Sequence, residues 1–161
     1  ATKVLTTVTS KDKAALASSP GADVVNNYRE QDLAKACLEA TGGVGWDRSM
    51  EVDFAANVAP DFAFPRRGGQ IVVYGSGAGE MPVPFVPALV KMARIVFFIV
   101  YNLADADRRQ AEATLTRWLA EKRLAHNIAA RLPLERIAEA HELVETGRAV
   151  GNVMLEVAGE R

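Results

Sequence analysis

The chain has 161 residues, about the length of one domain, and its 49% hydrophobic and 24% charged residues are typical of a soluble globular protein. Nineteen basic and twenty acidic residues give a formal net charge of −1, which argues against a nucleic-acid partner. No apolar run approaches the roughly 20 residues of a membrane span, and a signal-peptide pattern is absent. We therefore expect a cytoplasmic protein with no membrane partner. The single cysteine, Cys37, excludes an internal disulfide and a Cys-rich metal site.

In the first half of the chain, short apolar runs alternate with helical segments. Residues 4–8 form a β-branched run, and Ser10 is a suitable N-cap for a helix over 11–19. A second strand over 21–25 precedes a helix over about 30–40, which ends at Thr41-Gly42-Gly43. Further strands are predicted over 48–52 and 70–74.

The second half continues the alternation. Residues 95–101 are the most hydrophobic strand candidate, and Asp107 with Gln110 resembles a capping box. Pro133 and Gly147 bracket a helix over 134–146, and 153–157 is the terminal strand. Apolar strands that alternate with helices predict an α/β fold with a doubly wound, mostly parallel sheet of the Rossmann type.

Ligands of open α/β sheets bind at the carboxyl ends of the strands. After the first strand come Thr9 and Ser10, followed by Lys11 and Lys13, with no carboxylate at the turn itself. A hydroxyl and two ammonium groups at a helix N-terminus are suited to bind a phosphate. An ordinary solvated first helical turn is the alternative interpretation.

The glycine-rich segment 75–79 follows the predicted strand 70–74 but does not fit G-x-G-x-x-G. It is interpreted as a loop that lets a ligand approach the backbone, with a simple turn as the alternative. His141 falls on the apolar stripe of its helix and is expected in the core or an interface. Glu51 and Asp53 are expected to face apart, so no acid/base pair and no catalytic side chain is predicted.

Several short segments extend the analysis to nearly the whole chain. They are 1–4, 9–13, 21–24, 27–29, 41–47, 51–57, 68–76, 132–135, 140–142 and 147–151. In order and spacing they resemble the C-terminal half of the medium-chain dehydrogenase/reductase superfamily. The most similar subgroup is the zinc-free NADPH:quinone oxidoreductases, which include zeta-crystallin.

The resemblance implies an NADP(H) site, with no metal. Its 2′-phosphate residues would be Ser10 and Lys13, with Lys11 as an added cation. Tyr28 would lie at the adenine end, Asn57 near the ribose, and Arg148 near the phosphates, where Asn152 replaces a common lysine. The nicotinamide half would be bordered by Tyr74, Gly75, Ser76, Gly77, Val100 and Tyr101.

The same resemblance implies that parts of the family fold are missing. The N-terminal catalytic domain, the first Rossmann strand and its glycine-rich turn have no counterpart in the sequence. We therefore expect a truncated dinucleotide-binding domain over 1–125. Residues 126–161 would form a C-terminal return segment that packs on the absent catalytic domain.

The implied reaction is hydride transfer from NADPH to a quinone or another α,β-unsaturated carbonyl, with this chain alone inactive. A different medium-chain reductase, such as an enoyl reductase or an alcohol dehydrogenase, is the alternative enzyme. A non-catalytic nucleotide-binding or oligomerising module is the alternative of another class. The family also implies a homodimer through the strand over 95–101, whose apolar edge would otherwise be exposed.

Overall fold

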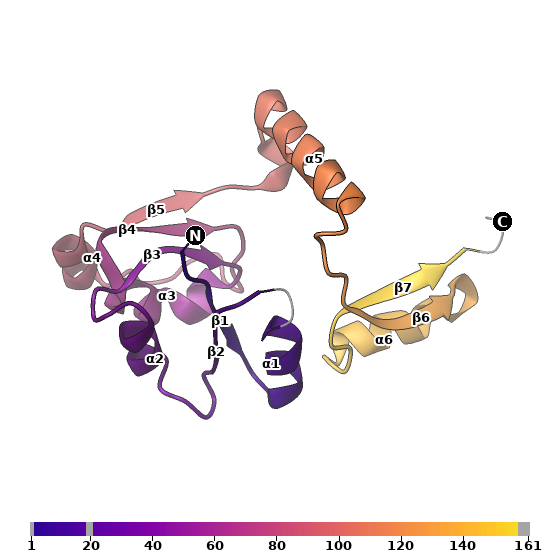
Figure 1. The fold of residues 1–161 in the computed structure, drawn as a ribbon, viewed down its shortest axis with the longest axis horizontal. Helices are drawn as coiled ribbons and strands as arrows, with labels where there is room; N and C mark the ends of the chain where they lie inside the picture. The colour runs from indigo at the N-terminus through magenta and orange to yellow at the C-terminus, as the bar shows by residue number, and fades with distance from the viewer. Residues whose placement is uncertain (1, 19–20, 158–161) are drawn as a thin grey trace.

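The computed structural model describes residues 2–18 and 21–157 and has an α/β fold in which every strand pairing is parallel. The strands form three separate sheets, in the orders β1-β2, β3-β4-β5 and β6-β7 (Figure 1). Parallel neighbours need a crossover connection, and a helix provides it in most of these pairs. The predicted parallel α/β class is therefore confirmed.

The first sheet contains β1 (Leu5–Val8) and β2 (Val24–Asn27), with α1 (Lys11–Ser18) between them and α2 (Leu33–Ala40) after β2. Strand β2 begins three residues later than predicted and includes the buried Asn26 and Asn27. Helix α2 also begins later than predicted, because the Asp32 side chain caps it by accepting a hydrogen bond from Lys35 N at 3.1 Å.

The second sheet holds the hydrophobic core. It consists of β3 (Trp46–Glu51), β4 (Pro65–Val73) and β5 (Arg94–Phe97), with α3 (Phe54–Ala63) and α4 (Phe85–Lys91) in the connections. Phe54 and Phe62 of α3 pack on Ile71 and Val73 of β4. The sequence pattern predicted neither helix: Pro60 lies inside α3, and α4 is only seven residues long.

Strand β5 is shorter than the predicted strand over 95–101. Its partner β4 ends at Val73, which lies opposite Phe97, and Phe98 N donates the last hydrogen bond to Val73 O at 3.1 Å. Beyond that point the chain has no β4 residue to pair with and turns into the short 3₁₀ helix η1 (Val100–Asn102). Tyr101 is consequently 80% exposed.

The third sheet pairs β6 (Ile128–Pro133) with β7 (Asn152–Glu156), joined through η2 (Leu134–Arg136) and α6 (Ile137–Glu145). Helix α5 (Asp105–Ala120) connects it to the second sheet (Figure 1). Because α5 begins at Asp105, Asp107 lies in its first turn and is not its N-cap. His141 is exposed on α6, so of the two predicted positions the core is wrong, and an interface stays a prediction.

Among the described residues, the edges of β1 and β3 and one sheet face have no covering element. Among the described residues, β1 and β3 belong to different sheets, and no backbone ladder joins them. On the sheet face that α3 and α4 leave free, Met50 is 62% exposed and Val96 40%. In residues 2–18 and 21–157, no helix is both long and apolar enough to cross a membrane.

Candidate functional site

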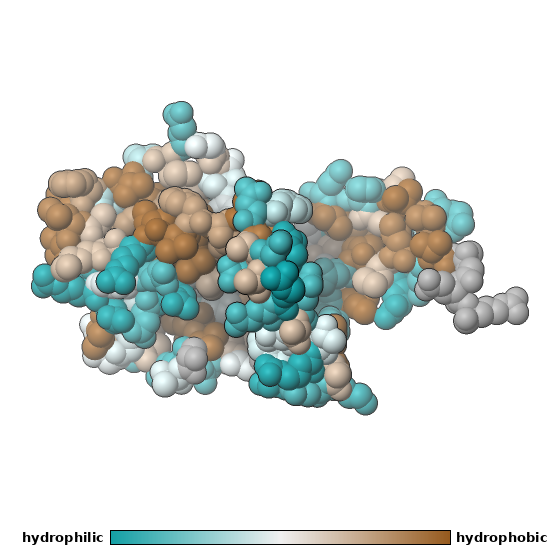
Figure 2. Space-filling model, turned by 90° about the horizontal axis from the view of Figure 1, so that it is seen from above, coloured by the Kyte–Doolittle hydropathy of each residue, from teal (hydrophilic) through white to brown (hydrophobic). Residues whose placement is uncertain are grey.

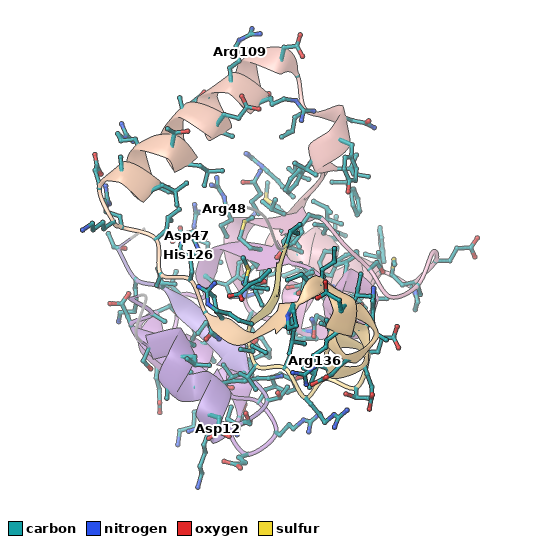
Figure 3. All side chains as sticks on the ribbon, turned by 90° about the vertical axis from the view of Figure 1, so that its right-hand side faces the viewer. Asp12, Asp47, Arg48, Arg109, His126 and Arg136 are labelled. Atoms are coloured by element: carbon teal, nitrogen blue, oxygen red, sulfur yellow. The ribbon has the colours of Figure 1, made fainter. Side chains whose placement is uncertain are left out.

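The N-terminus of α1 is the place where the sequence predicts an anion site. Ser10 Oγ accepts a hydrogen bond from Lys13 N at 3.3 Å, so Ser10 is the N-cap. Lys11 and Lys13 are exposed in the first turn, and in the described part of the chain neither ammonium has a carboxylate within 4.0 Å. Asp12 lies between them on the outer side of α1 (Figure 3). This turn can therefore offer two cations to a phosphate.

Tyr28 lies beside this turn. Its backbone N–H donates to Val8 O at 3.3 Å, which places the ends of β1 and β2 together. The side chain is half exposed. The structure thus brings four of the predicted site residues, at the ends of β1 and β2, into one group: Ser10, Lys11, Lys13 and Tyr28.

A second group lies at the ends of β3 and β4. Tyr74 N donates to Glu51 O at 3.0 Å, and Phe54 N donates to Gly75 O at 3.2 Å. Glycine is required at position 75, because a Cβ there would lie 2.3 Å from Val52 O. These contacts hold the two strand ends against each other.

Several polar groups of the loop over 75–79 are already hydrogen-bonded to other groups of the protein. Gly77 N donates to Asp53 Oδ1 at 2.8 Å. Ser76 Oγ donates to Ala78 O at 2.8 Å and accepts from Ala78 N at 3.3 Å. Because two backbone N–H groups are already bonded within the protein, this loop is poorly suited to cradle a pyrophosphate.

Val100 and Tyr101 lie beyond β5 in η1, outside the sheet. The Arg108 guanidinium donates to the carbonyl oxygens of Val100 at 3.3 Å and Tyr101 at 3.2 Å. The Tyr74 ring contacts the Phe98 ring, with their centroids 5.9 Å apart. The end of β5 therefore neighbours the end of β4 through aromatic side chains.

Two buried carboxyl groups, Glu51 of β3 and Asp61 of α3, lie close to the second group. Glu51 and Asp61 are 8% and 7% exposed, and Asn57 donates from Nδ2 to Glu51 Oε1 at 3.1 Å. Burial, followed by the charge of Glu51, raises the pKa of Asp61 to about 7, while the nearby Ser49 hydroxyl lowers it. The Asn57 amide, predicted near a ribose, is thus committed to an internal carboxylate.

Glu51 and Asp53 interact, contrary to the expectation that they face apart. Glu51 Oε1 accepts a hydrogen bond from Asp53 N at 2.7 Å. Residues two apart on a strand lie on the same face, and the chain also turns after Glu51. The bond joins a carboxylate to a backbone N–H, so it is not an acid/base pair.

Arg148 belongs to the third sheet's unit and is occupied there. Its guanidinium donates to Glu142 Oε1 at 2.6 Å and to Thr146 Oγ1 at 3.0 Å. The predicted contact of Arg148 with cofactor phosphates therefore competes with an existing ion pair. At the start of β7, Asn152 N donates to Asn127 O at 2.8 Å.

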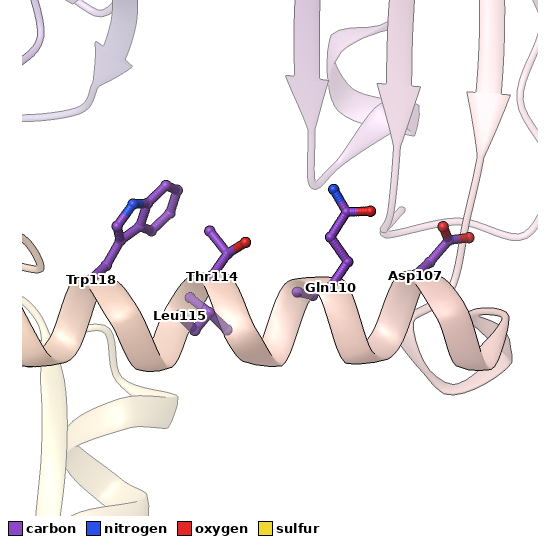
Figure 4. A pocket seen from close by; sticks show the side chains of 6 residues that line it. Asp107, Gln110, Thr114, Leu115 and Trp118 are labelled. Carbon is purple, nitrogen blue, oxygen red and sulfur yellow. The ribbon is translucent and has the colours of Figure 1, made fainter.

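Two shallow hollows lie in the described part of the chain. One, of about 460 Å³, follows one side of α5 and is lined by Asp107, Gln110, Ala111, Thr114, Leu115 and Trp118 (Figure 4). The other, of about 420 Å³, is lined by Lys13, Leu16, Ala17, Asn127, Ala149, Val150 and Gly151. Of the predicted site residues, only Lys13 lines either hollow.

The described residues do not fit a metal. In 2–18 and 21–157, no three His, Cys, Asp or Glu side chains are grouped as potential ligands. Cys37 is a buried free thiol, and burial raises its pKa, which disfavours the reactive thiolate.

The sequence prediction missed Asp53 and the Glu51–Asp61 pair. Asp53 could have been found by the strand-end rule, because it follows β3 by two residues. The Glu51–Asp61 pair is joined only by the packing of α3 on β3, and no sequence spacing indicates it.

Comparison with known proteins identifies the family. Residues 20–155 match the model of a family described as zinc-binding dehydrogenases. The quinone oxidoreductase of Pongo abelii is 27% identical over 154 residues, which cover 95% of this chain and 46% of that protein.

Solved structures share the fold. An NAD-dependent alcohol dehydrogenase superposes with a TM-score of 0.83 at 29% identity, covering 97% of this chain and 44% of that one. A mycobacterial protein complexed with NADPH gives 0.79 at 24% identity, covering 95% and 48%. The chain thus spans about half the length of these relatives. It belongs to the zinc-binding dehydrogenase family, within the medium-chain dehydrogenase/reductase superfamily.

Proposed function

We propose that the chain is the coenzyme-binding part of an oxidoreductase that transfers a hydride from NADPH to a quinone or another α,β-unsaturated carbonyl. The observation that carries this proposal is the N-terminus of α1, where Ser10 caps the helix and Lys11 and Lys13 are exposed. A carboxylate at the strand end would repel a 2′-phosphate, and positions 9 and 10 are Thr and Ser.

Each strand-end group has a separate task in this proposal. Lys11 and Lys13 bind the 2′-phosphate, and Tyr28 borders the adenine. Tyr74 and the loop over 75–79 border the nicotinamide half, and η1 closes that side with Val100 and Tyr101. When bound, NADPH supplies the hydride; the protein orients the dinucleotide and excludes water. We propose no general acid or base from this chain.

Zinc has no place in this proposal. The family description names the metal, but the described residues offer no set of ligands for it. Residues 126–161 would pack on a second domain that carries the acceptor site, and the protein would act in the cytoplasm.

An alcohol dehydrogenase is a second candidate, because the NAD-dependent alcohol dehydrogenase covers almost the whole chain at 29% identity. An enoyl reductase is the other enzymatic alternative, and a non-catalytic nucleotide-binding module is the alternative outside enzymes. The intact protein distinguishes these by its turnover. We expect oxidation of NADPH with a quinone, and no reduction of NADP⁺ or NAD⁺ by an alcohol. Oxidation of an alcohol would identify an alcohol dehydrogenase. The absence of turnover with every acceptor tested would identify a non-catalytic module.

We further propose that the protein is a homodimer through β5. In the three-stranded sheet β5 is the last strand, and Phe97 and Ile99 are 66% and 51% exposed. Figure 2 shows hydrophobic side chains gathered on the face over β5 and α4. A second copy with the same edge would cover these groups and extend the sheet.

A further inference from the structure

Asp53 stands between β3 and α3, at the N-cap position of that helix, but its side chain does not cap the helix. It instead crosses to the neighbouring strand end, where Oδ1 accepts a hydrogen bond from Gly77 N at 2.8 Å. Twenty-four residues separate the two partners. An N-cap carboxylate usually satisfies the first N–H groups of its own helix, so its use in another loop needs a reason.

The backbone at Asp53 and at the residues around it is itself fixed by hydrogen bonds. Its backbone N–H donates to the buried Glu51 carboxylate at 2.7 Å. On either side of it, Glu51 O and Phe54 N bond to Tyr74 N and Gly75 O. The Asp53 carboxylate therefore extends from a backbone segment that three hydrogen bonds hold in place, at Glu51 O, Asp53 N and Phe54 N.

The loop has little other support. Among the described residues, the Asp53–Gly77 bond is the one hydrogen bond that joins residues 76–79 to a different element. The contact is also close, because a Cβ at position 77 would lie 3.2 Å from Asp53 Oδ1. Glycine at 77 lets the carboxylate approach the backbone directly.

We propose that Asp53 is a positioning residue, whose carboxylate holds the loop over 75–79 in the place from which it borders the dinucleotide. This inference rests on the proposed function. Asp53 does not contact the ligand in this role; it acts through Gly77. Its charge strengthens a backbone hydrogen bond, and an N–H that bonds to a carboxylate is held more firmly than one that bonds to a neutral oxygen.

The first part of the test is independent of any ligand. We would measure hydrogen exchange of the Gly77 amide in this chain by NMR, in the unchanged protein and in Asp53→Ala and Asp53→Asn. Asp53→Ala should exchange Gly77 at least about tenfold faster, and Asp53→Asn should restore part of the protection because its amide oxygen still accepts. An unprotected Gly77 amide in the unchanged chain would overturn the proposal without any variant.

The second part uses the intact protein and NADPH, followed by nicotinamide fluorescence and by quinone turnover. We expect Asp53→Ala to raise the dissociation constant for NADPH and the KM about tenfold. The kcat should change less, and Asp53→Asn should recover most of the loss. Asp47→Ala is the matched control, since Asp47 lies at the other end of β3 on the surface, paired with Arg66.

The outcomes separate the two proposals. If the unchanged protein binds neither NADPH nor NADH, the proposed function fails, and Gly77 exchange still decides whether Asp53 holds the loop. If Gly77 loses protection in Asp53→Ala while NADPH binding is unchanged, the loop does not position the dinucleotide, and this inference is wrong. Equal effects of Asp47→Ala and Asp53→Ala would also overturn it.

Discussion

In the proposed function, Ser10, Lys11 and Lys13 carry the cofactor preference, because charge discriminates at short range. The Ser10 cap fixes the direction in which the first helical turn presents its N–H groups, and the lysine stems extend from that turn into solvent. The exposed Asp12 belongs to the same turn (Figure 3). Two lysines and one aspartate therefore give this turn one net positive charge. On this charge rests our proposal that the turn binds a 2′-phosphate.

We predict that the double change Lys11→Ala and Lys13→Ala weakens NADPH binding by the intact protein about tenfold or more. A charge-assisted hydrogen bond to a phosphate contributes on the order of 1.5–3 kcal/mol. NADH binding should change little, since NADH has no 2′-phosphate. The measurement is a fluorescence titration with both nucleotides. Lys35→Ala is the control, because Lys35 is exposed and pairs with Glu39 on its own helix, α2. Equal affinity of the unchanged protein for NADPH and NADH would contradict the prediction.

The raised pKa of Asp61 allows a prediction of how the free energy of unfolding depends on pH. Its pKa of about 7 in the folded chain compares with about 3.9 when unfolded. Between these values the folded chain binds a proton that the unfolded chain does not. The contribution of Asp61 to the free energy of unfolding is therefore largest below about pH 4, and it falls as the pH rises towards 7. Three pKa units set an upper bound of about 4 kcal/mol.

We predict that Asp61→Asn flattens this dependence and raises stability near pH 7.5. A buried amide carries no charge to desolvate, and it needs no proton to stay neutral. Urea unfolding of this chain at pH 5 and pH 7.5 gives the measurement, with the exposed Asp47→Asn as control. A pH slope that is the same in the unchanged chain and in Asp61→Asn would show that Asp61 is not the responsible group.

At the scale of elements, β5 shows how a partner strand limits its neighbour. The run over 95–101 is apolar throughout, yet the strand ends at Phe97 because β4 ends opposite it. Phe98 N bonds to β4, so alternation along a strand directs the N–H groups of Phe97 and Ile99 to the outer edge. That outer edge is open to a second copy of the chain.

We predict that Ile99→Lys converts the proposed homodimer to a monomer. Lysine on a strand edge prevents another strand from pairing, because its charge would be buried in the interface. Light scattering at micromolar concentration should report a dimer for the unchanged protein. Val144→Lys is the matched control, since Val144 is equally apolar, exposed on α6 and remote from β5. A monodisperse monomer before any substitution would refute the interface.

At the scale of the whole molecule, the candidate site is divided between two sheets. Tyr28 and the lysines belong to the first, while Tyr74 and its loop belong to the second. In the described residues no backbone hydrogen bond joins β1 to β3. Unpaired backbone groups at such edges cost about 1–3 kcal/mol each when buried, against a total stability of about 5–15 kcal/mol. Among the described residues, no strand ladder therefore holds the two halves of the site in register.

We predict that this chain by itself is inactive and binds NADPH weakly. A ligand that bridges two unfixed sheets must order them, which uses up part of its binding energy. Calorimetric titration should give NADPH little more affinity than adenosine 2′,5′-bisphosphate, which needs only the first sheet. NADPH binding more than about 100-fold tighter than the fragment would contradict the prediction. So would quinone reduction by this chain alone.

The sequence by itself determined the parallel α/β class, the family and the capped turn at Ser10, because these depend on local pattern. Caps, glycine turns and apolar runs act over a few residues, and a helix such as α1 begins where its own Ser10 permits. Tyr28, Tyr74 and Gly75 stand just after strands, where the sheet rule placed them, whereas Asn57 lies in α3 and Arg148 between α6 and β7.

Only the tertiary structure decided the rest, because contacts between distant residues leave no local signal. The end of β5 depends on the length of β4, and the pKa of Asp61 depends on the packing of α3 over Glu51. The packing also engaged Arg148 with Glu142 and Asn57 with Glu51, which the sequence had assigned to the cofactor. Asp53 reaches Gly77 because two parallel strands end side by side, and 24 residues of sequence separate what the sheet brings within 2.8 Å.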